Sequence, residues 1–182
     1  MILRDYKKII PVRYHNVSYE TDVKEVLKTE VTSQIQKREG LYLWGESGSG
    51  KTHIACALTK EFLEKGIDVM FFNTGDFLEK LREEFEKPFE DEEHVGLFRE
   101  VMDFEGVLIF DDIGSEKASD WSRERLYLII NKKYEDMIPM IFTSNCDLEI
   151  LSARMGDRIT SRISGMTSIM MVDGGDRRLT QK

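Results

Sequence analysis

The chain has 182 residues, of which 41% are hydrophobic and 33% are charged, and its formal net charge is −8. This acidic balance argues against a surface that coats duplex DNA, and the lack of a secretion signal or of a ~20-residue apolar run argues against export and against a membrane partner. Cys56 and Cys146 lie far apart in apolar surroundings, so we expect a cytoplasmic protein with reduced, buried thiols.

In chain order, the hydrophobic pattern predicts a lead-in segment, 1–39, and then a core, 40–178, in which strands alternate with helices. The lead-in is polar apart from a helical pattern between Val23 and Ile35. In the core, apolar runs predict strands over 41–44, 67–73, 107–110, 139–143 and 168–172. Periodic stretches predict helices over 51–65, from Asp76 as N-cap, over 92–104, from Ser119 or Asp120 to 136, and over 157–164.

This alternation predicts one α/β domain, 1–182, with helices on both faces of a central five-stranded parallel sheet. The fold has three layers, and ligands of such sheets bind at the carboxyl ends of the strands. The polar residues that follow the predicted strands are therefore the candidate functional residues.

The segment GESGSGKT directly follows the first predicted strand and opens a helix. This context favours a phosphate-binding loop over a flexible Gly/Ser turn, because consecutive backbone N–H groups and the positive end of the helix would face the phosphates. We expect Lys51 to reach the β- and γ-phosphates and the Thr52 hydroxyl to bind Mg²⁺. The residues predicted to bind ATP or ADP in this way are Gly45, Glu46, Ser47, Gly48, Ser49, Gly50, Lys51 and Thr52.

Two acids and one amide end the neighbouring predicted strands. Asp111 and Asp112 follow the apolar run 107–110, where the first is suited to hold Mg²⁺ and the second to orient or deprotonate an attacking water. Asn145 follows the run 139–143 and either bonds the γ-phosphate and that water or forms a turn, which is a common role of asparagine. From the residues alone, these two alternatives are about equal.

Three arginines, Arg154, Arg158 and Arg162, follow one another at intervals of four residues. If the segment is helical, they lie along one side of it. Such a stripe is either a solvated face or an arginine finger that contacts the γ-phosphate bound to a neighbouring subunit.

Taken together, these residues resemble AAA+ ATPases of the DnaC/IstB group, which are P-loop NTPases related to the initiator DnaA. The resemblance covers about residues 10–178, and its most specific motifs are GESGSGKTH, LIFDDIGSEKASDW, FTSN and DRITSRI. It implies that His53 joins the nucleotide-binding loop, that Asn145 is the sensor-1 residue and that Arg162 is the arginine finger.

The same resemblance implies further features of the site. Arg158 would be a second interface arginine, and Arg177 or Arg178 would be the sensor-2 residue that touches the nucleotide within its own subunit. The helical lid that usually follows the fifth strand would be absent or vestigial, as is common in this group.

The function that the resemblance implies is an ATPase that loads a replicative helicase, acting as a helical or ring oligomer on single-stranded DNA. An IstB-like transposition helper shares the ATP machinery and stays an alternative. A monomeric small-molecule kinase and a scaffold without hydrolysis are alternatives of other classes. No lid insertion is evident and the pair Asp111-Asp112 suits water activation, which argues against the kinase. The intact Lys51, Asp111, Asp112 and Arg162 argue against the scaffold.

Candidate DNA contacts lie between Asp76 and Phe104, where basic and aromatic residues alternate. The spacing of Phe77, Leu81 and Phe85 is equally typical of a helix face in the core, and many glutamates share the stretch. The sequence therefore does not single out a DNA contact.

Overall fold

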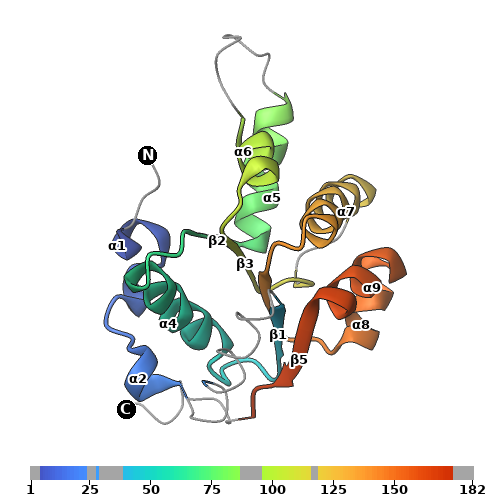
Figure 1. Ribbon diagram of the computed structural model, residues 1–182. Helices are drawn as coiled ribbons and strands as arrows, with labels where there is room; N and C mark the ends of the chain where they lie inside the picture. The colour runs from blue at the N-terminus through green and yellow to red at the C-terminus, as the bar shows by residue number, and fades with distance from the viewer. Residues whose placement is uncertain (1–4, 24–27, 29–38, 87–95, 116–118, 174–182) are drawn as a thin grey trace.

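The computed structural model describes residues 5–23, 28, 39–86, 96–115 and 119–173, and its centre is a parallel sheet of five strands (Figure 1). The strands lie in the order β2-β3-β4-β1-β5. Their bounds are Gly40–Trp44 for β1, Val69–Asn73 for β2, Val107–Asp111 for β3, Met140–Ser144 for β4 and Thr167–Met171 for β5. The predicted α/β fold with a five-stranded parallel sheet is confirmed.

The sheet forms because its strands are apolar on both faces, as buried parallel strands are. On one face, Tyr42, Phe110 and Phe142 pack in a core cluster with the helices that lie between residues 74 and 166. On the other, Leu43 and Ile109 pack against the helix that follows β1. The predicted three layers are therefore present, with the sheet between two layers of helices (Figure 1).

Nine helical segments accompany the sheet in the described part of the chain. Three short ones form the lead-in, and the others connect or follow strands. Their bounds are Tyr6–Ile9 (α1), Val12–Tyr14 (η1), Tyr19–Asp22 (α2), Lys51–Glu64 (α4), Thr74–Glu86 (α5), Leu97–Asp103 (α6), Asp120–Glu135 (α7), Leu148–Met155 (α8) and Asp157–Met166 (α9). None of the helices of these described ranges is long and apolar enough to cross a membrane.

The described part of the lead-in holds short helices that the sequence did not predict. The helix expected from Val23 to Ile35 falls almost entirely outside the described residues, while α1, η1 and α2 pack along α4. The Lys60 ammonium of α4 fastens them by donating to the carbonyl oxygens of His15 at 3.1 Å and Val17 at 2.6 Å. One-turn helices of this kind have no periodicity to detect.

The structure corrects two predicted helix details. Helix α5 begins at Thr74 rather than after Asp76, because the Asn73 side chain accepts the Asp76 N–H at 3.2 Å and takes the capping position. Helix α8 was not predicted, although its N-cap Asp147 accepts the N–H of Ile150.

The arginine stripe is also partly wrong. Gly156, with φ at +95°, separates α8 from α9, so Arg154 does not share a helix with Arg158 and Arg162. Only the last two lie one turn apart on the same element. One smaller prediction holds: Cys56 and Cys146 are buried and unpaired.

Candidate functional site

The glycine-rich loop joins β1 to α4 at the carboxyl edge of the sheet. Gly48 and Gly50 have φ values of +84° and +102°, which L side chains rarely adopt. A Cβ on Gly45 would lie 2.5 Å from the Val172 carbonyl oxygen, so the loop packs closely against the chain after β5. Glycine is needed at these positions for the loop to close around a ligand.

Lys51 opens α4 and is buried under this loop. Its ammonium donates to the carbonyl oxygens of Gly45 and Glu46, both at 2.8 Å. It also donates to Asn145 Oδ1 at 2.9 Å, across from the end of β4. The lysine therefore joins the loop to the neighbouring strand, and an anion in the loop would lie within reach of the same charge.

Asp111 ends β3 and is only 6% exposed. Its carboxylate accepts hydrogen bonds from the hydroxyl groups of Thr52 at 2.9 Å and Thr143 at 2.6 Å. Burial raises the pKa of Asp111 above its ordinary value, and the nearby charge of Asp112 adds to the rise, while these hydrogen bonds and Lys51 oppose it. A bound cation would favour the charged carboxylate.

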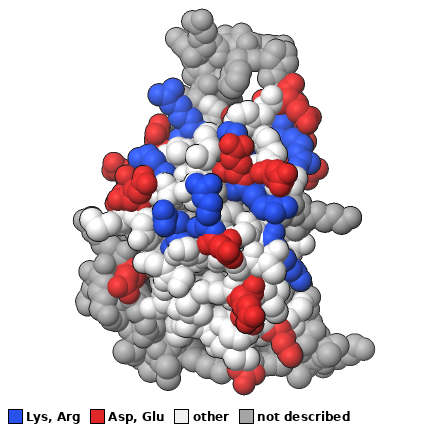
Figure 2. All heavy atoms as spheres, turned by 90° about the vertical axis from the view of Figure 1, so that its right-hand side faces the viewer, with Lys and Arg blue, Asp and Glu red and all other residues white. Residues whose placement is uncertain are grey.

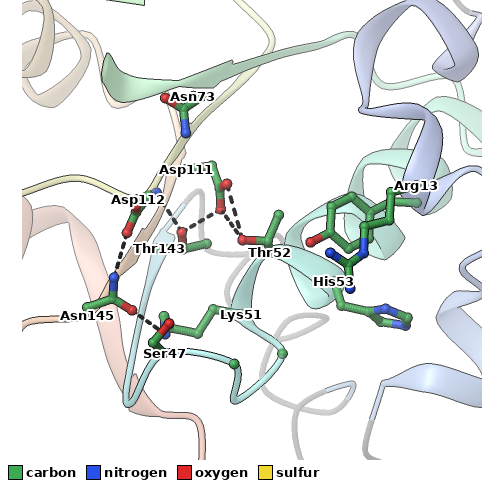
Figure 3. A pocket seen from close by; sticks show the side chains of 13 residues that line it. Arg13, Ser47, Lys51, Thr52, His53, Asn73, Asp111, Asp112, Thr143 and Asn145 are labelled. Carbon is green, nitrogen blue, oxygen red and sulfur yellow. Dashed lines mark hydrogen bonds between the residues drawn. The ribbon is translucent and has the colours of Figure 1, made fainter. Parts of the chain in front are cut away.

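Asp112 has a backbone φ of +61°, which is uncommon for a residue other than glycine. Its N–H donates to Thr143 Oγ1 at 2.8 Å, and its carboxylate accepts from Asn145 Nδ2 at 2.9 Å. The Asn145 amide thus bridges Lys51 and Asp112, as Figure 3 shows.

These side chains line a pocket of about 480 Å³. The sequence identified most of the lining, but it missed Thr143, Asn73 and two residues of the lead-in, Arg13 and Tyr14. Thr143 could have been noticed as a polar residue inside a buried strand end. The complete lining is Arg13, Tyr14, Ser47, Gly48, Gly50, Lys51, Thr52, His53, Asn73, Asp111, Asp112, Thr143 and Asn145.

His53 lies on the side of the pocket that faces the lead-in (Figure 3). Its Nε2 is 3.0 Å from the Asp22 carboxylate, and its ring meets the Tyr14 ring edge-on. A hydrogen bond from the Ser18 N–H, aided by His53, lowers the pKa of Asp22. The loop is therefore tied to the lead-in beside the pocket.

The donor set fits a nucleotide with Mg²⁺. The Thr52 hydroxyl and the Asp111 carboxylate offer adjacent oxygens, which are the ligands that Mg²⁺ prefers. Among the described residues, no cluster of three or more His, Cys, Asp or Glu side chains could hold a metal alone. Such a site would be completed by phosphate oxygens, as expected of Mg²⁺ bound with a nucleotide.

The three arginines of the predicted stripe do not line this pocket. Arg154 donates to the Gly114 carbonyl oxygen at 2.7 Å, behind the acidic pair. Arg158 and Arg162 lie on α9, where their guanidinium groups cover the rings of Tyr127 and Tyr134 of α7. Arg177 and Arg178, the predicted sensor-2 residues, are outside the described residues.

Known proteins resemble this chain over most of its length. Residues 5–182 match the family model described as IstB-like ATP binding protein. The replicative helicase loader DnaI of Bacillus subtilis is 26% identical over 155 residues, which cover 78% of this chain and 48% of DnaI. For the replicative helicase loader DnaC of Escherichia coli, the identity is 23%, and the match covers 72% of this chain and 53% of that protein.

The chain thus spans about half the length of these helicase loaders. It matches more of the insertion sequence IS5376 ATP-binding protein of Geobacillus stearothermophilus, with 25% identity over 97% of this chain and 70% of that protein.

Solved structures agree with these matches. A crystal structure of the DnaC helicase loader superposes with a TM-score of 0.71 and 28% identity, covering 90% of this chain and 100% of that one. The AMPPCP-bound DnaA of Aquifex aeolicus gives a TM-score of 0.72 at 20% identity, covering 92% of this chain and 53% of that one. These likenesses confirm the predicted P-loop fold of the AAA+ type.

Proposed function

The chain belongs to the family of IstB-like ATP binding proteins, and from this premise we propose that it is an ATP-hydrolysing factor that loads a replicative helicase onto single-stranded DNA. Residues 1–182 would form one AAA+ ATPase domain. The observation that carries the ATP-hydrolysing part of the proposal is the hydrogen-bonded chain from Lys51 through Asn145 to Asp112 at the mouth of the glycine-rich loop. It brings a phosphate-binding cation, an amide and a carboxylate together where a terminal phosphate would lie.

The roles within the pocket follow from chemistry. Residues 45–53 hold the phosphates of ATP or ADP, and Thr52 and Asp111 hold Mg²⁺, which would neutralise charge on the phosphate oxygens. Asp112 orients the attacking water and accepts its proton, since its carboxylate faces the pocket beside Asn145. Arg177 or Arg178 would contact the same nucleotide as sensor 2.

Self-assembly is the second part of the proposal. Arg158 and Arg162 lie on the α7–α9 side of the molecule and do not line their own subunit's pocket. Figure 2 looks onto this side and shows basic side chains gathered across its middle. In a helical or ring oligomer, Arg162 would reach the nucleotide of the next subunit as an arginine finger, with Arg158 beside it.

Single-stranded DNA is the third part. The sequence left open whether the aromatic residues of α5 belong to the core or to a surface that stacks on DNA bases. The structure contains both kinds: Phe77 is buried in the core, while Phe85 is 45% exposed. The Phe85 ring lies 5.9 Å from the rings of both Phe98 and Trp121. The guanidinium of Arg125 covers Phe85 at 5.2 Å, and that of Arg82 covers Trp121 at 5.4 Å.

We call the five exposed or half-buried residues among these the aromatic–arginine cluster; its members are Arg82, Phe85, Phe98, Trp121 and Arg125. Aromatic rings and arginines side by side are how proteins bind a single strand without reading its sequence. Phe85→Ala should weaken binding of a fluorescent oligonucleotide about tenfold, a typical loss for one stacked base. Lys65→Ala, a distant lysine paired with Glu61, is the control, and equal effects of the two changes would reject the cluster.

An IstB-like transposition helper is the second candidate, since the insertion-sequence relative matches 97% of this chain. The same ATPase would then serve a transposase instead of a helicase. Pull-down of the purified protein with a replicative helicase or with a transposase, in the presence of ATP, separates the two candidates.

The central test is ATP turnover per protomer over a range of protein concentrations, with and without single-stranded DNA. We expect the rate per protomer to rise with both, because the finger comes from another subunit. Lys51→Ala, which removes the cation under the loop, should abolish ATP binding. A rate that stays flat in protein and DNA would reject the shared site, and turnover by Lys51→Ala would reject the loop assignment.

A further inference from the structure

One side of α7 presents a polar and aromatic stripe to α9. Tyr127, Asn131 and Tyr134 lie at i, i+4 and i+7, so they share a helix face. The Arg158 guanidinium lies 4.0 Å from the centre of the Tyr127 ring, and that of Arg162 lies 4.9 Å from the Tyr134 ring. Both arginines of α9 therefore rest on this stripe.

Asn131 fixes the orientation of Arg162. Its Oδ1 accepts from Arg162 Nε at 2.9 Å, while its Nδ2 donates to Glu135 Oε1 at 2.9 Å. The second bond holds the amide with its oxygen toward the arginine. Because Nε is the donor used, the two terminal nitrogens of the guanidinium stay available, and among the described residues no carboxylate forms an ion pair with Arg162.

Stacking is compatible with phosphate binding. A cation over an aromatic ring uses the face of the guanidinium plane, whereas its N–H groups point outward in that plane. An arginine held in this way can still donate two parallel hydrogen bonds to a phosphate.

The helix that carries the stripe is firmly seated. Leu126, Ile129 and Ile130 of the same helix are fully buried, and the buried Lys133 ammonium donates to the Met102 carbonyl oxygen at 3.0 Å. Gly165 of α9 lets the Tyr134 ring lie close, since a Cβ there would be 3.1 Å from Tyr134 Cε2. The stripe is therefore a fixed support rather than a mobile surface.

From these contacts we propose that Tyr134 and Asn131, with Tyr127 beneath Arg158, are positioning residues that hold the arginines in the geometry in which they meet a neighbouring subunit's nucleotide. The proposal rests on the proposed function, because it needs Arg162 to act between subunits. Ordering a free arginine side chain costs a factor of about ten to thirty in an equilibrium constant. Holding it in place beforehand removes part of that cost.

The test uses two changes that each put an aliphatic side chain in place of a group that contacts Arg162. Tyr134→Leu removes the ring, and Asn131→Leu removes the acceptor of the Arg162 Nε–H. Each should lower turnover about tenfold at saturating ATP and leave ATP affinity unchanged. Tyr134→Phe keeps the ring and should retain turnover, which makes it the matched control.

Mixing experiments show in which subunit the stripe acts. Each stripe variant is mixed with Lys51→Ala subunits, which carry intact arginines but no working loop. The mixture should recover turnover, because Lys51→Ala neighbours supply a correctly held Arg162 to the variant's intact pocket. Arg162→Ala mixed with Lys51→Ala is the reference, and thermal unfolding of each variant alone reports on folding.

The outcomes separate the two proposals. If Arg162→Ala recovers on mixing but Tyr134→Leu does not, the loss of the Tyr134 ring impairs the nucleotide pocket of the same subunit, and the inference is wrong. If Arg162→Ala itself fails to recover, the shared active site is rejected, and the inference is rejected with it. Turnover by Tyr134→Phe as low as that by Tyr134→Leu would also overturn the stacking argument.

Discussion

The pocket at the carboxyl edge of the sheet and the α7–α9 side differ in how their polar groups are satisfied. In the pocket, Lys51, Asn145 and Asp112 bond to one another within one subunit. On the α7–α9 side, Arg162 makes one hydrogen bond through Nε and one stacking contact, and its terminal nitrogens bond to no other described residue. Folding of one chain completes the first arrangement, whereas in the proposed oligomer the second would act on the nucleotide of a neighbouring subunit.

Changes in the two regions should therefore have different signatures. Those in the pocket should affect the variant's own site and should not depend on its neighbours. Those on the α7–α9 side should spare nucleotide binding, lower turnover only in the assembled state and be rescued by mixing.

The largest effect is expected on the α7–α9 side. Arg162→Ala should lower turnover roughly 10³- to 10⁵-fold, the range seen for arginine fingers, while ATP affinity stays unchanged. Lys65→Ala removes a lysine at the end of α4 that pairs with Glu61 and serves as the control for loss of a surface cation. Single-turnover hydrolysis checks the expected loss of turnover, and a binding titration checks the unchanged ATP affinity. Normal turnover by Arg162→Ala would mean that the α7–α9 side takes no part in hydrolysis.

In the pocket, Asp112→Asn should lower turnover about 10²- to 10⁴-fold, because the amide cannot accept the proton of the attacking water. Mg·ATP binding should persist, since Asp111 and the loop are unchanged. Unlike Arg162→Ala, this variant should gain nothing from mixing with Lys51→Ala subunits. Equal loss of binding and turnover would mean that the roles of the two acids are exchanged.

A smaller effect should follow from Thr143, whose hydroxyl bonds both acids. It donates to Asp111 Oδ1 at 2.6 Å and accepts the Asp112 N–H at 2.8 Å. Thr143→Val keeps the shape and removes both bonds, so turnover should fall about ten- to hundredfold, the equivalent of about 1.5–3 kcal/mol for bonds to a charged group. Thr143→Ser should restore most of it, and failure of serine to do so would point to packing of the methyl group instead.

The two regions also differ in how far the sequence predicts them. Each strand of the sheet appears as a run of apolar residues, and parallel strands end at a common edge, so the pattern alone brings together the residues that follow β1, β3 and β4. Thr143 is harder to predict: a polar residue at the end of a buried strand stands out, but no spacing rule reveals its partner.

On the α7–α9 side, the sequence predicts the arginines but not their support. Tyr127, Asn131 and Tyr134 have the spacing of any half-exposed helix face, and only the crossing of α7 and α9 gives them a partner. The sequence also places Arg154 on the same stripe as Arg158 and Arg162, because it does not show that Gly156 breaks the helix. A glycine with positive φ cannot be distinguished from a tolerated helix glycine by sequence alone.

The smallest expected effect comes from Gly165→Ala, which should lower turnover without lowering stability. Gly165→Ala replaces glycine inside α9, which favours the helix by about 0.5–1 kcal/mol in exposed positions. The new Cβ would lie 3.1 Å from the Tyr134 ring, so the ring must yield by a few tenths of an ångström. We expect an unchanged or slightly raised melting temperature and a turnover that falls roughly two- to threefold, since Arg162 loses part of its support. ATP affinity should not change, because Gly165 does not line the pocket. Loss of turnover together with loss of stability would mean that α9 is disrupted as a whole, and the stripe would then be a packing feature rather than a support for the finger.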